Sequence, residues 1–185
     1  MKHTGTINIS TERLQLRRFY KEDADDCFNN WMVDEEVYEF LSASPKDRKY
    51  IEEWLSCADE VYAKNDTYYW AIVEKESGKT VGEIFVNDYS EKNRVAELWW
   101  TVGSHFKSKG YATEAAKAIV SHLFNEVGFH RVWAKCVDGN IGSERVMQKC
   151  GMEKEGIMRE YFYDDKTGEY KDLVVYSVIN QTHRG

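Results

Sequence analysis

The sequence predicts an α/β fold of the α+β kind, with a mixed central sheet of about seven strands and about four helices. Its 185 residues are enough for one domain with a substantial core. Strand-like and helix-like patterns alternate along the chain, without a repeat, a low-complexity tract or a linker. Residues 94–137 read as strand, loop, helix and strand, an order that favours a crossover between parallel strands. We therefore expect a single domain over residues 1–185.

The first half of the chain predicts a strand, two helices and a group of three strands. Apolar and polar residues alternate over 7–19, as in a strand, and early acidic residues suit a helix over 20–34. Ser44 is suited to cap a second helix, with Pro45 at its first position, that extends to about residue 64. Short turns join three strands, which are therefore expected to be antiparallel neighbours, at residues 68–74, 80–89 and 94–102.

The second half predicts a long helix, a short helix and three strands. Apolar residues at helical spacing form one face over 112–127, with Thr113 as the cap or a first-turn residue. A strand follows at 131–137, and Asn140 then caps a short helix that Gly151 closes. The last two strands are expected at residues 153–162 and 170–179. The side chains singled out as core are Trp54, Leu123, Phe124 and Trp133.

Composition and charge exclude several classes of function. Hydrophobic residues make up 42% of the chain, yet no apolar run could span a membrane and the N-terminus has no signal-peptide core. We therefore expect a cytoplasmic protein. The four cysteines lie far apart and the five histidines form no close pair, so no metal site is expected. A formal net charge of −7 disfavours a direct nucleic-acid partner and is compatible with a cationic substrate such as an amine.

A basic loop containing a glycine joins the 94–102 strand to the long helix: Lys107-Ser108-Lys109-Gly110-Tyr111-Ala112. The start of a helix leaves free N–H groups, the glycine lets a ligand approach the backbone, and the two lysines add positive charge. Together these features predict a site for a phosphate or a diphosphate. Neither G-x-G-x-x-G nor G-x-x-x-x-G-K-[ST] occurs, so a Rossmann dinucleotide site and a Walker A loop are not supported.

Four elements in a fixed order carry a resemblance to a known family. They are the strand from Glu97, the loop Lys107-x-x-Gly110-x-Ala112, the segment from Asn140-x-x-Ser143 to Gly151-Met152, and the tail 172–177. In this order the chain resembles the GNAT N-acetyltransferases, although their acyl-CoA loop usually has Gln or Arg where this chain has a lysine. The opening Thr11-Glu12-Arg13-Leu14-x-Leu16-Arg17 makes it most similar to the branch of RimJ and RimL, which acetylate ribosomal proteins.

The resemblance implies acetyl-CoA as the donor and no metal. It implies that the diphosphate lies on the backbone N–H groups of residues 107–112. It also implies that the pantetheine arm follows the carboxyl end of the strand, residues 99–102, where this strand separates from the 131–137 strand. Asn140 and Ser143 are then expected beside the thiol. The implied cofactor-binding residues are Trp100, Thr101, Val102, Lys107, Ser108, Lys109, Gly110, Tyr111, Ala112, Thr113, Asn140 and Ser143.

The family mechanism, direct attack of a neutral amine on the thioester, implies a base for the amine and a donor for the leaving thiolate. Glu97 is the first candidate base and Glu83 the second; a water relay is an alternative, and either carboxylate can instead be ion-paired. Many members place a tyrosine acid in the helix after the crossover, where this chain has Met147. Ser143 is therefore the candidate donor, unless it only bonds the backbone, and Tyr176 is expected in the core.

Three functions remain open at this point. The first is acetylation of the α-amine of a protein or peptide. The second is acetylation of a small amine such as a polyamine, amino acid or aminoglycoside. The third is binding of acyl-CoA by a non-catalytic sensor. The RimJ and RimL branch favours the first. Residues 34–40 mix acidic and aromatic side chains and form either a solvated loop or part of an acceptor pocket. The expected partners are acetyl-CoA and the amine acceptor, with a second copy in a homodimer as a candidate.

Overall fold

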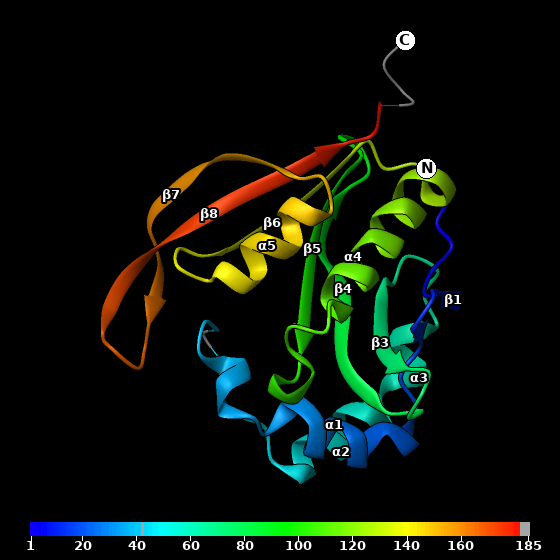
Figure 1. Cartoon of the computed structure of the whole chain (residues 1–185). Helices are drawn as coiled ribbons and strands as arrows, with labels where there is room; N and C mark the ends of the chain where they lie inside the picture. The colour runs from blue at the N-terminus through cyan, green and yellow to red at the C-terminus, as the bar shows by residue number, and fades with distance from the viewer. Residues whose placement is uncertain (42, 182–185) are drawn as a thin grey trace.

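Figure 1 shows a computed structural model of the chain, which describes residues 1–41 and 43–181. Its strands are β1 (Ile9–Ser10), β2 (Leu14–Arg17), β3 (Tyr69–Glu74), β4 (Thr80–Ser90), β5 (Val95–Val102), β6 (Arg131–Val137), β7 (Glu153–Asp164) and β8 (Glu169–Ile179). Its α-helices are α1 (Ala24–Cys27), α2 (Arg48–Ser56), α3 (Ala58–Tyr62), α4 (Tyr111–His122) and α5 (Ile141–Lys149). The 3₁₀ turns are η1 (Lys21–Asp23), η3 (Glu35–Tyr38) and η4 (Ser104–Phe106), and the π-helical turns are η2 (Phe28–Met32) and η5 (Leu123–Val127).

The strands of the described residues form one eight-stranded sheet in the order β1-β2-β3-β4-β5-β6-β8-β7. The β3, β4 and β5 strands are antiparallel neighbours, and β5 and β6 are parallel, as the sequence predicted. The sheet has one strand more than the predicted seven because the first predicted strand, 7–19, is divided. Thr11 N donates to Leu14 O at 2.9 Å, and the chain reverses there into a β1–β2 hairpin.

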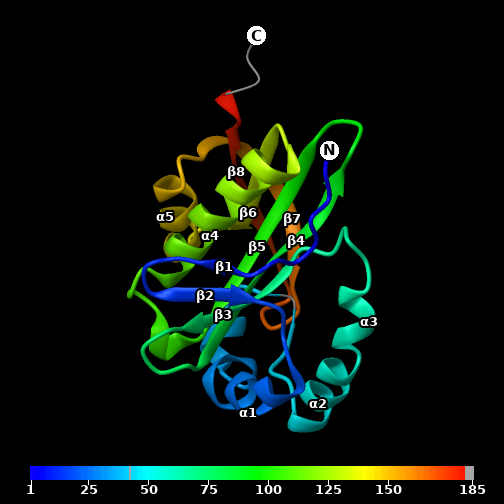
Figure 2. The ribbon, with the colours of Figure 1, turned by 90° about the vertical axis from the view of Figure 1, so that its right-hand side faces the viewer.

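Each face of the sheet has its own hydrophobic core, because the side chains of β3 alternate between the two faces. Trp70 and Ile72 pack with α4 and α5, whereas Ala71 and Val73 pack with α1, α2 and α3. Figure 2 shows α4 and α5 on one side of the sheet and the N-terminal helices away from them. The uninterrupted apolar run of β3 follows from this burial on both faces.

Two helices begin at residues other than those predicted. Asp47, and not Ser44, caps α2, because its carboxylate accepts a hydrogen bond from a first-turn backbone N–H at 2.8 Å. The α4 helix begins at Tyr111 with Gly110 as its N-cap, so Thr113 lies in the first turn. The earlier start of α4 brings the helix N-terminus directly against the basic loop.

The predicted core is only partly correct. Leu123 is fully buried, but Trp54, Phe124 and Trp133 are half-buried. Trp54 faces a cavity that is described below, so one side of its ring has no protein neighbour. Apolar periodicity predicts which face of an element points inward, but not whether a cavity lies there.

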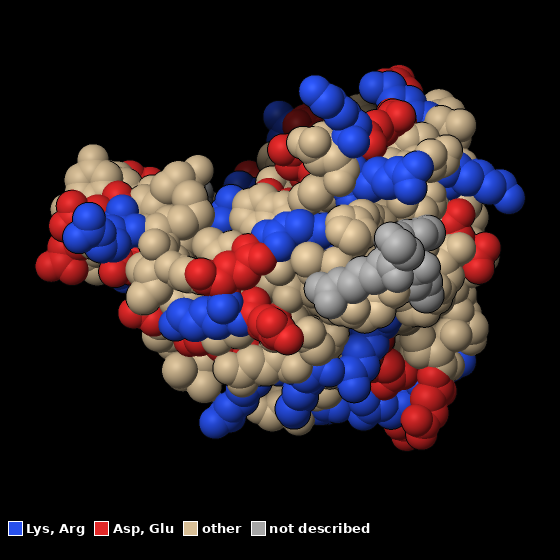
Figure 3. All heavy atoms as spheres, turned by 90° about the horizontal axis from the view of Figure 1, so that it is seen from above, with Lys and Arg blue, Asp and Glu red and all other residues tan. Residues whose placement is uncertain are grey.

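The surface carries charges of both signs. Seen from above, in Figure 3, lysine and arginine side chains are interspersed with carboxylates, and one arm of the molecule projects away from the body. In Figure 1 this arm is the β7–β8 hairpin. Among the described residues, the helices are too short and too polar to cross a membrane.

Leu123 provides a test of the core on the α4 face. Leu123→Ala should lower the free energy of unfolding by about 2–5 kcal/mol, because it leaves a cavity under a fully buried side chain. Chemical denaturation measures this change. Glu126→Ala, an exposed position in the same π-helical turn, is the control and should change stability by less than about 0.5 kcal/mol. Equal effects of the two substitutions would contradict the packing of this turn against the sheet.

Candidate active site

The parallel strands β5 and β6 pair along three residues and then separate. The last of these pairs is Glu97 with Trp133. Beyond it, β5 stays paired with β4 as far as Gly82 and Val102, while β6 stays paired with β8 on its other edge. The facing edges therefore form a fork, at the place where the resemblance to the GNAT family implied that the two strands separate.

A buried ion pair lies at the closed end of this fork, where β5 and β6 are still paired. Lys135 Nζ lies 2.8 Å from Glu97 Oε1, and Asn87 Nδ2, at a bulge of β4, donates to Glu97 Oε2 at 2.8 Å. The Lys135 ammonium also lies 5.8 Å from the ring centroid of Trp99 and 5.1 Å from that of Trp133. Burial works against ionisation, yet the bonds from Lys135 and Asn87 keep the pKa of Glu97 below its ordinary value. Glu97, the first candidate base, is thus an ion-paired carboxylate.

A cavity of about 500 Å³ lies where the basic loop, the end of β5 and the start of α5 meet, and we call it the loop-side cavity. The residues predicted to bind acetyl-CoA line it, with the exception of Lys109. The Lys109 ammonium lies 3.7 Å from Glu74 and above the rings of Phe106 and Tyr111. This lysine therefore stabilises the loop through contacts outside the loop-side cavity.

The loop presents backbone N–H groups to the loop-side cavity. Ser108 and Gly110 adopt the left-handed conformation, with φ of 64° and 82°. Left-handed residues in such a turn direct neighbouring N–H groups to one side, which creates a concavity for an anion. Because Gly110 caps α4 without a side-chain bond, the first N–H groups of that helix remain available to a ligand.

Arg13 forms an ion pair with the carboxylate in the first turn of α4. Glu114, in the first turn of α4, accepts hydrogen bonds from Arg13 Nε at 2.7 Å and from Thr11 Oγ1 at 2.6 Å. Arg13 Nη1 also donates to Lys109 O at 2.8 Å, which ties the loop to the β1–β2 turn. The start of α4 therefore keeps its attraction for an anion, although an acidic residue stands there.

Two cations of the loop-side cavity were missed in the sequence. Arg145 and Lys149, four residues apart on α5, line it together with Lys107. Their spacing after the Asn140 cap places them on one helix face, and this was the signal that could have found them. Lys107 also donates to Glu36 O at 3.2 Å. A chain with a net charge of −7 thus gathers positive charge at this cavity.

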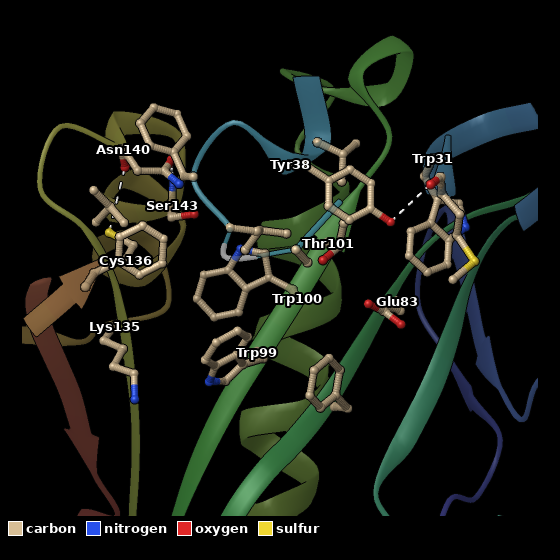
Figure 4. Close-up of a pocket in the computed structure, with 18 of the residues that line it drawn as sticks. Trp31, Tyr38, Glu83, Trp99, Trp100, Thr101, Lys135, Cys136, Asn140 and Ser143 are labelled. Atoms are coloured by element: carbon tan, nitrogen blue, oxygen red, sulfur yellow. Dashed lines mark hydrogen bonds between the residues drawn. The ribbon is translucent and has the colours of Figure 1, made fainter. Parts of the chain in front are cut away.

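A second cavity of about 740 Å³ adjoins the first, and we call it the aromatic cavity. Its wall includes rings from several elements, namely Trp31, Tyr38, Trp54, Tyr69, Phe85 and Trp99. Trp100, Thr101, Asn140 and Ser143 line both cavities, so the two meet at the end of β5. Figure 4 shows Trp100 and Thr101 between Glu83 on one side and the start of α5 on the other.

Glu83 lies in the wall of the aromatic cavity, opposite Thr101 in the β4–β5 register. Its carboxylate accepts a hydrogen bond from the Tyr69 hydroxyl. Burial raises the pKa of Glu83 to about 7, against the bonds from Tyr69 and Thr101, which favour the charged form. Burial also raises the pKa of Tyr69 well above its ordinary value, so this phenol remains a donor. Of the two predicted carboxylates, Glu83 is the one that faces a cavity and titrates near neutrality.

The start of α5 stands at the junction of the cavities. Asn140 Oδ1 accepts from Ser143 N at 3.1 Å, so Asn140 caps this helix as predicted. In Figure 4, Ser143 lies beside Asn140 on the side of Trp100. Met147 is fully buried, and Tyr176 is buried as predicted, with its hydroxyl donating to a carboxylate of α5 at 2.9 Å.

The segment around η3 covers the junction. Val37, Phe40 and Leu41 line both cavities. Lys166 Nζ, in the turn between β7 and β8, donates to Tyr38 O at 2.6 Å and thereby connects the arm to this segment. Of the two alternatives for residues 34–40, a wall of the pocket is therefore the one that agrees with the structure.

The amino-acid pattern described as an acetyltransferase (GNAT) domain matches residues 13–153, which is more than half of the chain. The chain belongs to the GNAT acetyltransferase family. It is therefore an acyltransferase with a single GNAT domain, and the resemblance inferred from the loop and its neighbouring elements is confirmed. The last four residues of the expected domain lie outside the described part of the chain.

Relatives and solved structures agree with this assignment. The uncharacterized N-acetyltransferase YnaD of Bacillus subtilis (strain 168) is 30% identical over 181 residues, which cover 95% of this chain and 98% of that protein. A ribosomal-protein-S5-alanine acetyltransferase from Vibrio fischeri has a TM-score of 0.82 at 21% identity, covering 97% of this chain and 100% of that one. A RimL ribosomal-protein acetyltransferase in complex with coenzyme A has a TM-score of 0.81 at 16% identity, covering 94% and 98%. At these identities the two structures establish a shared fold.

Gly110 provides a test of the loop-side cavity. Gly110→Glu should weaken the affinity for coenzyme A by roughly tenfold or more, because it places a negative charge and bulk at the anion concavity. Calorimetry with coenzyme A measures the affinity. Gly78→Glu is a matched control, since Gly78 is also left-handed, with φ of 71°, but lies in the open β3–β4 turn. Both variants add the same charge at a left-handed glycine, although a Cβ at Gly110 also comes within 3.4 Å of Arg13 Nη2, whereas one at Gly78 meets no atom within 4 Å. Equal affinities would contradict the assignment of the loop.

Proposed function

We propose that this acyltransferase moves the acetyl group of acetyl-CoA to the α-amine of a protein or peptide N-terminus. In this proposal acetyl-CoA occupies the loop-side cavity and the acceptor occupies the aromatic cavity. The observation that carries the proposal is that the two cavities meet at Trp100, Thr101, Asn140 and Ser143. The thioester of one substrate and the amine of the other can therefore meet at this junction, because no strand of the sheet separates the two cavities there.

The chain's own residues suit the donor. The N–H groups of the loop and of the first turn of α4 hold the diphosphate, with Lys107, Arg145 and Lys149 as counter-charges. The free edge of β5 beyond Glu97 offers backbone groups to an extended arm. Bound acetyl-CoA supplies the thioester that the neutral amine attacks. The residues at the junction orient that thioester toward the aromatic cavity.

Glu83 is the proposed base. A base must be ionised at the working pH and must still accept a proton readily, which a pKa of about 7 allows. An α-ammonium has a pKa of about 8, so transferring its proton to Glu83 costs only about 1 kcal/mol. For an alkylammonium with a pKa of about 10.4, the same transfer costs about 4–5 kcal/mol. Whatever the base, an α-ammonium loses its proton at a lower cost than an alkylammonium, and this favours an α-amine acceptor over a polyamine.

The walls of the aromatic cavity also disfavour a polyamine or an aminoglycoside. Such acceptors carry several ammonium groups, and each needs a carboxylate or another polar partner. Among the described residues that line the cavity, the carboxylates are Glu83 and Asp165. Two carboxylates in a wall that is otherwise rich in aromatic rings provide few partners for an acceptor with several ammonium groups.

Ser143 is the proposed donor to the departing sulfur. Its backbone N–H already bonds to the Asn140 side chain, so the hydroxyl is not needed to cap α5. The hydroxyl can then stabilise negative charge as it develops at the junction. Met147 cannot donate a hydrogen bond to the sulfur, because its side chain has no donor and is buried in the core.

The two carboxylates can be separated by their pH profiles. At a pH below about 7 Glu83 is protonated and cannot accept a proton, so kcat/KM of the wild type should fall as the pH drops through this value. We call this fall in kcat/KM at low pH the acidic limb of the pH profile. Glu83→Gln should lower kcat by roughly 10²–10⁴-fold and remove the acidic limb that Glu83 causes. Glu97→Gln should keep the limb but lose stability, because it leaves Lys135 without its buried partner.

Both variants are compared with the wild type on one acceptor peptide, so that ionisation of the amine itself cancels. If the acidic limb of the kcat/KM profile disappears in Glu97→Gln and persists in Glu83→Gln, Glu97 is the base instead. A limb unchanged in both would indicate a water relay.

Ser143→Ala tests the donor. It should lower kcat by roughly tenfold while the affinity for coenzyme A stays the same, because the hydrogen bond strengthens only as thiolate charge develops. Steady-state kinetics and calorimetry measure the two quantities. Gln148→Ala is the control, because Gln148 is exposed on the same helix and lines neither cavity, and it should change neither quantity. Wild-type turnover in Ser143→Ala would leave solvent to protonate the sulfur.

A further inference from the structure

The wall around Glu83 is a continuous row of aromatic rings. The ring centroids of Trp54 and Tyr69 are 5.8 Å apart, those of Tyr69 and Phe85 are 5.2 Å apart, and those of Phe85 and Trp99 are 6.2 Å apart. Glu83 lies two residues from Phe85 on β4 and is bonded to Tyr69. An amine held at this carboxylate is therefore bordered by rings.

The arm adds further rings from the other side. Tyr161, Phe162 and Tyr163 of β7 line the same cavity, and Lys166 holds the arm against the η3 segment. The volume of about 740 Å³ is large enough for one bulky side chain together with the backbone that carries its amine. A methyl or hydroxymethyl group at that place would leave most of the aromatic surface in contact with water.

We infer that the acceptor is a peptide or protein whose first residue has a large apolar side chain, aromatic or branched aliphatic, in preference to alanine or serine. This inference rests on the proposed function and specifies its substrate class. The side chain of the first residue packs on Tyr69, Phe85 and Trp99 while the α-amine faces Glu83. Apolar contact area, and not hydrogen bonding, then provides the selectivity.

The test uses four peptides that differ only in the first residue, which is phenylalanine, leucine, alanine or serine. Thiol release from acetyl-CoA gives kcat/KM for each peptide on the full-length protein. The phenylalanine and leucine peptides should exceed the alanine peptide by roughly tenfold or more. Equal values, or a preference for alanine or serine, would overturn the inference while leaving the α-amine acetyltransferase intact. If none of the four is acetylated while coenzyme A binds, the proposed function itself is wrong.

A pair of variants ties the preference to the cavity. Phe85→Ala removes a ring of the wall and should lower the ratio of kcat/KM between the phenylalanine and alanine peptides by roughly tenfold. Phe124→Ala removes a half-buried ring that packs against the core on the α4 face, and it should leave this ratio unchanged. The ratio compares two peptides on one preparation, so partial unfolding cancels. A ratio that is unchanged in Phe85→Ala would contradict the inference.

Discussion

The separation of β5 from β6 after a few residue pairs is the constraint on which both cavities depend. A strand that loses its neighbour exposes backbone N–H and C=O groups, and these need a partner. Glu97 and Lys135 form their ion pair where the strands are still close, and Asn87 at the β4 bulge supplies a second bond. Removing either charge would leave the other buried without a partner, which is strongly destabilising. The pair therefore lies at the point where the sheet opens.

The two cavities differ in electrostatic character, although they share the end of β5. Among the described residues, the loop-side cavity is lined by three cations, Lys107, Arg145 and Lys149, and one carboxylate, Glu36. The aromatic cavity is lined by two carboxylates, Glu83 and Asp165, and two lysines, Lys46 and Lys135. In the aromatic cavity, apolar rings remove water from Glu83 and raise its pKa. One side thus attracts a multiply charged anion, and the other can accept a proton at neutral pH. This contrast is what two-substrate transfer between an anionic thioester and an amine requires.

Much of the fold could be predicted from the sequence because its signals are local. The antiparallel group, the crossover, the Asn140 cap and the glycine loop each depend on residues close together in the chain. The divided first strand was missed because one turn bond at Thr11 reverses a chain whose alternation continues across it. The α2 start was missed because Ser44 and Asp47 are both good caps, and only the folded chain selects one.

The different surroundings of Glu83 and Glu97 could not be predicted from the sequence. Alternation puts Glu97 and Thr101 on one face of β5, and Glu83 lies opposite Thr101, so both acids occupy the same face of the sheet. What distinguishes them is Lys135, which comes from another strand and neutralises Glu97. The aromatic wall was missed for the same reason, since its rings come from elements far apart in the chain.

An amide NMR spectrum recorded while coenzyme A is added tests the account most directly, because it reports on the backbone around both cavities at once. The largest shift changes should occur in residues 111–113, at the start of α4, and in residues 100–102, along the free edge of β5. Residues that line the aromatic cavity alone, such as Glu83 and Phe85, should change much less. Largest changes at those residues instead would contradict the division of the fork into a donor side and an acceptor side.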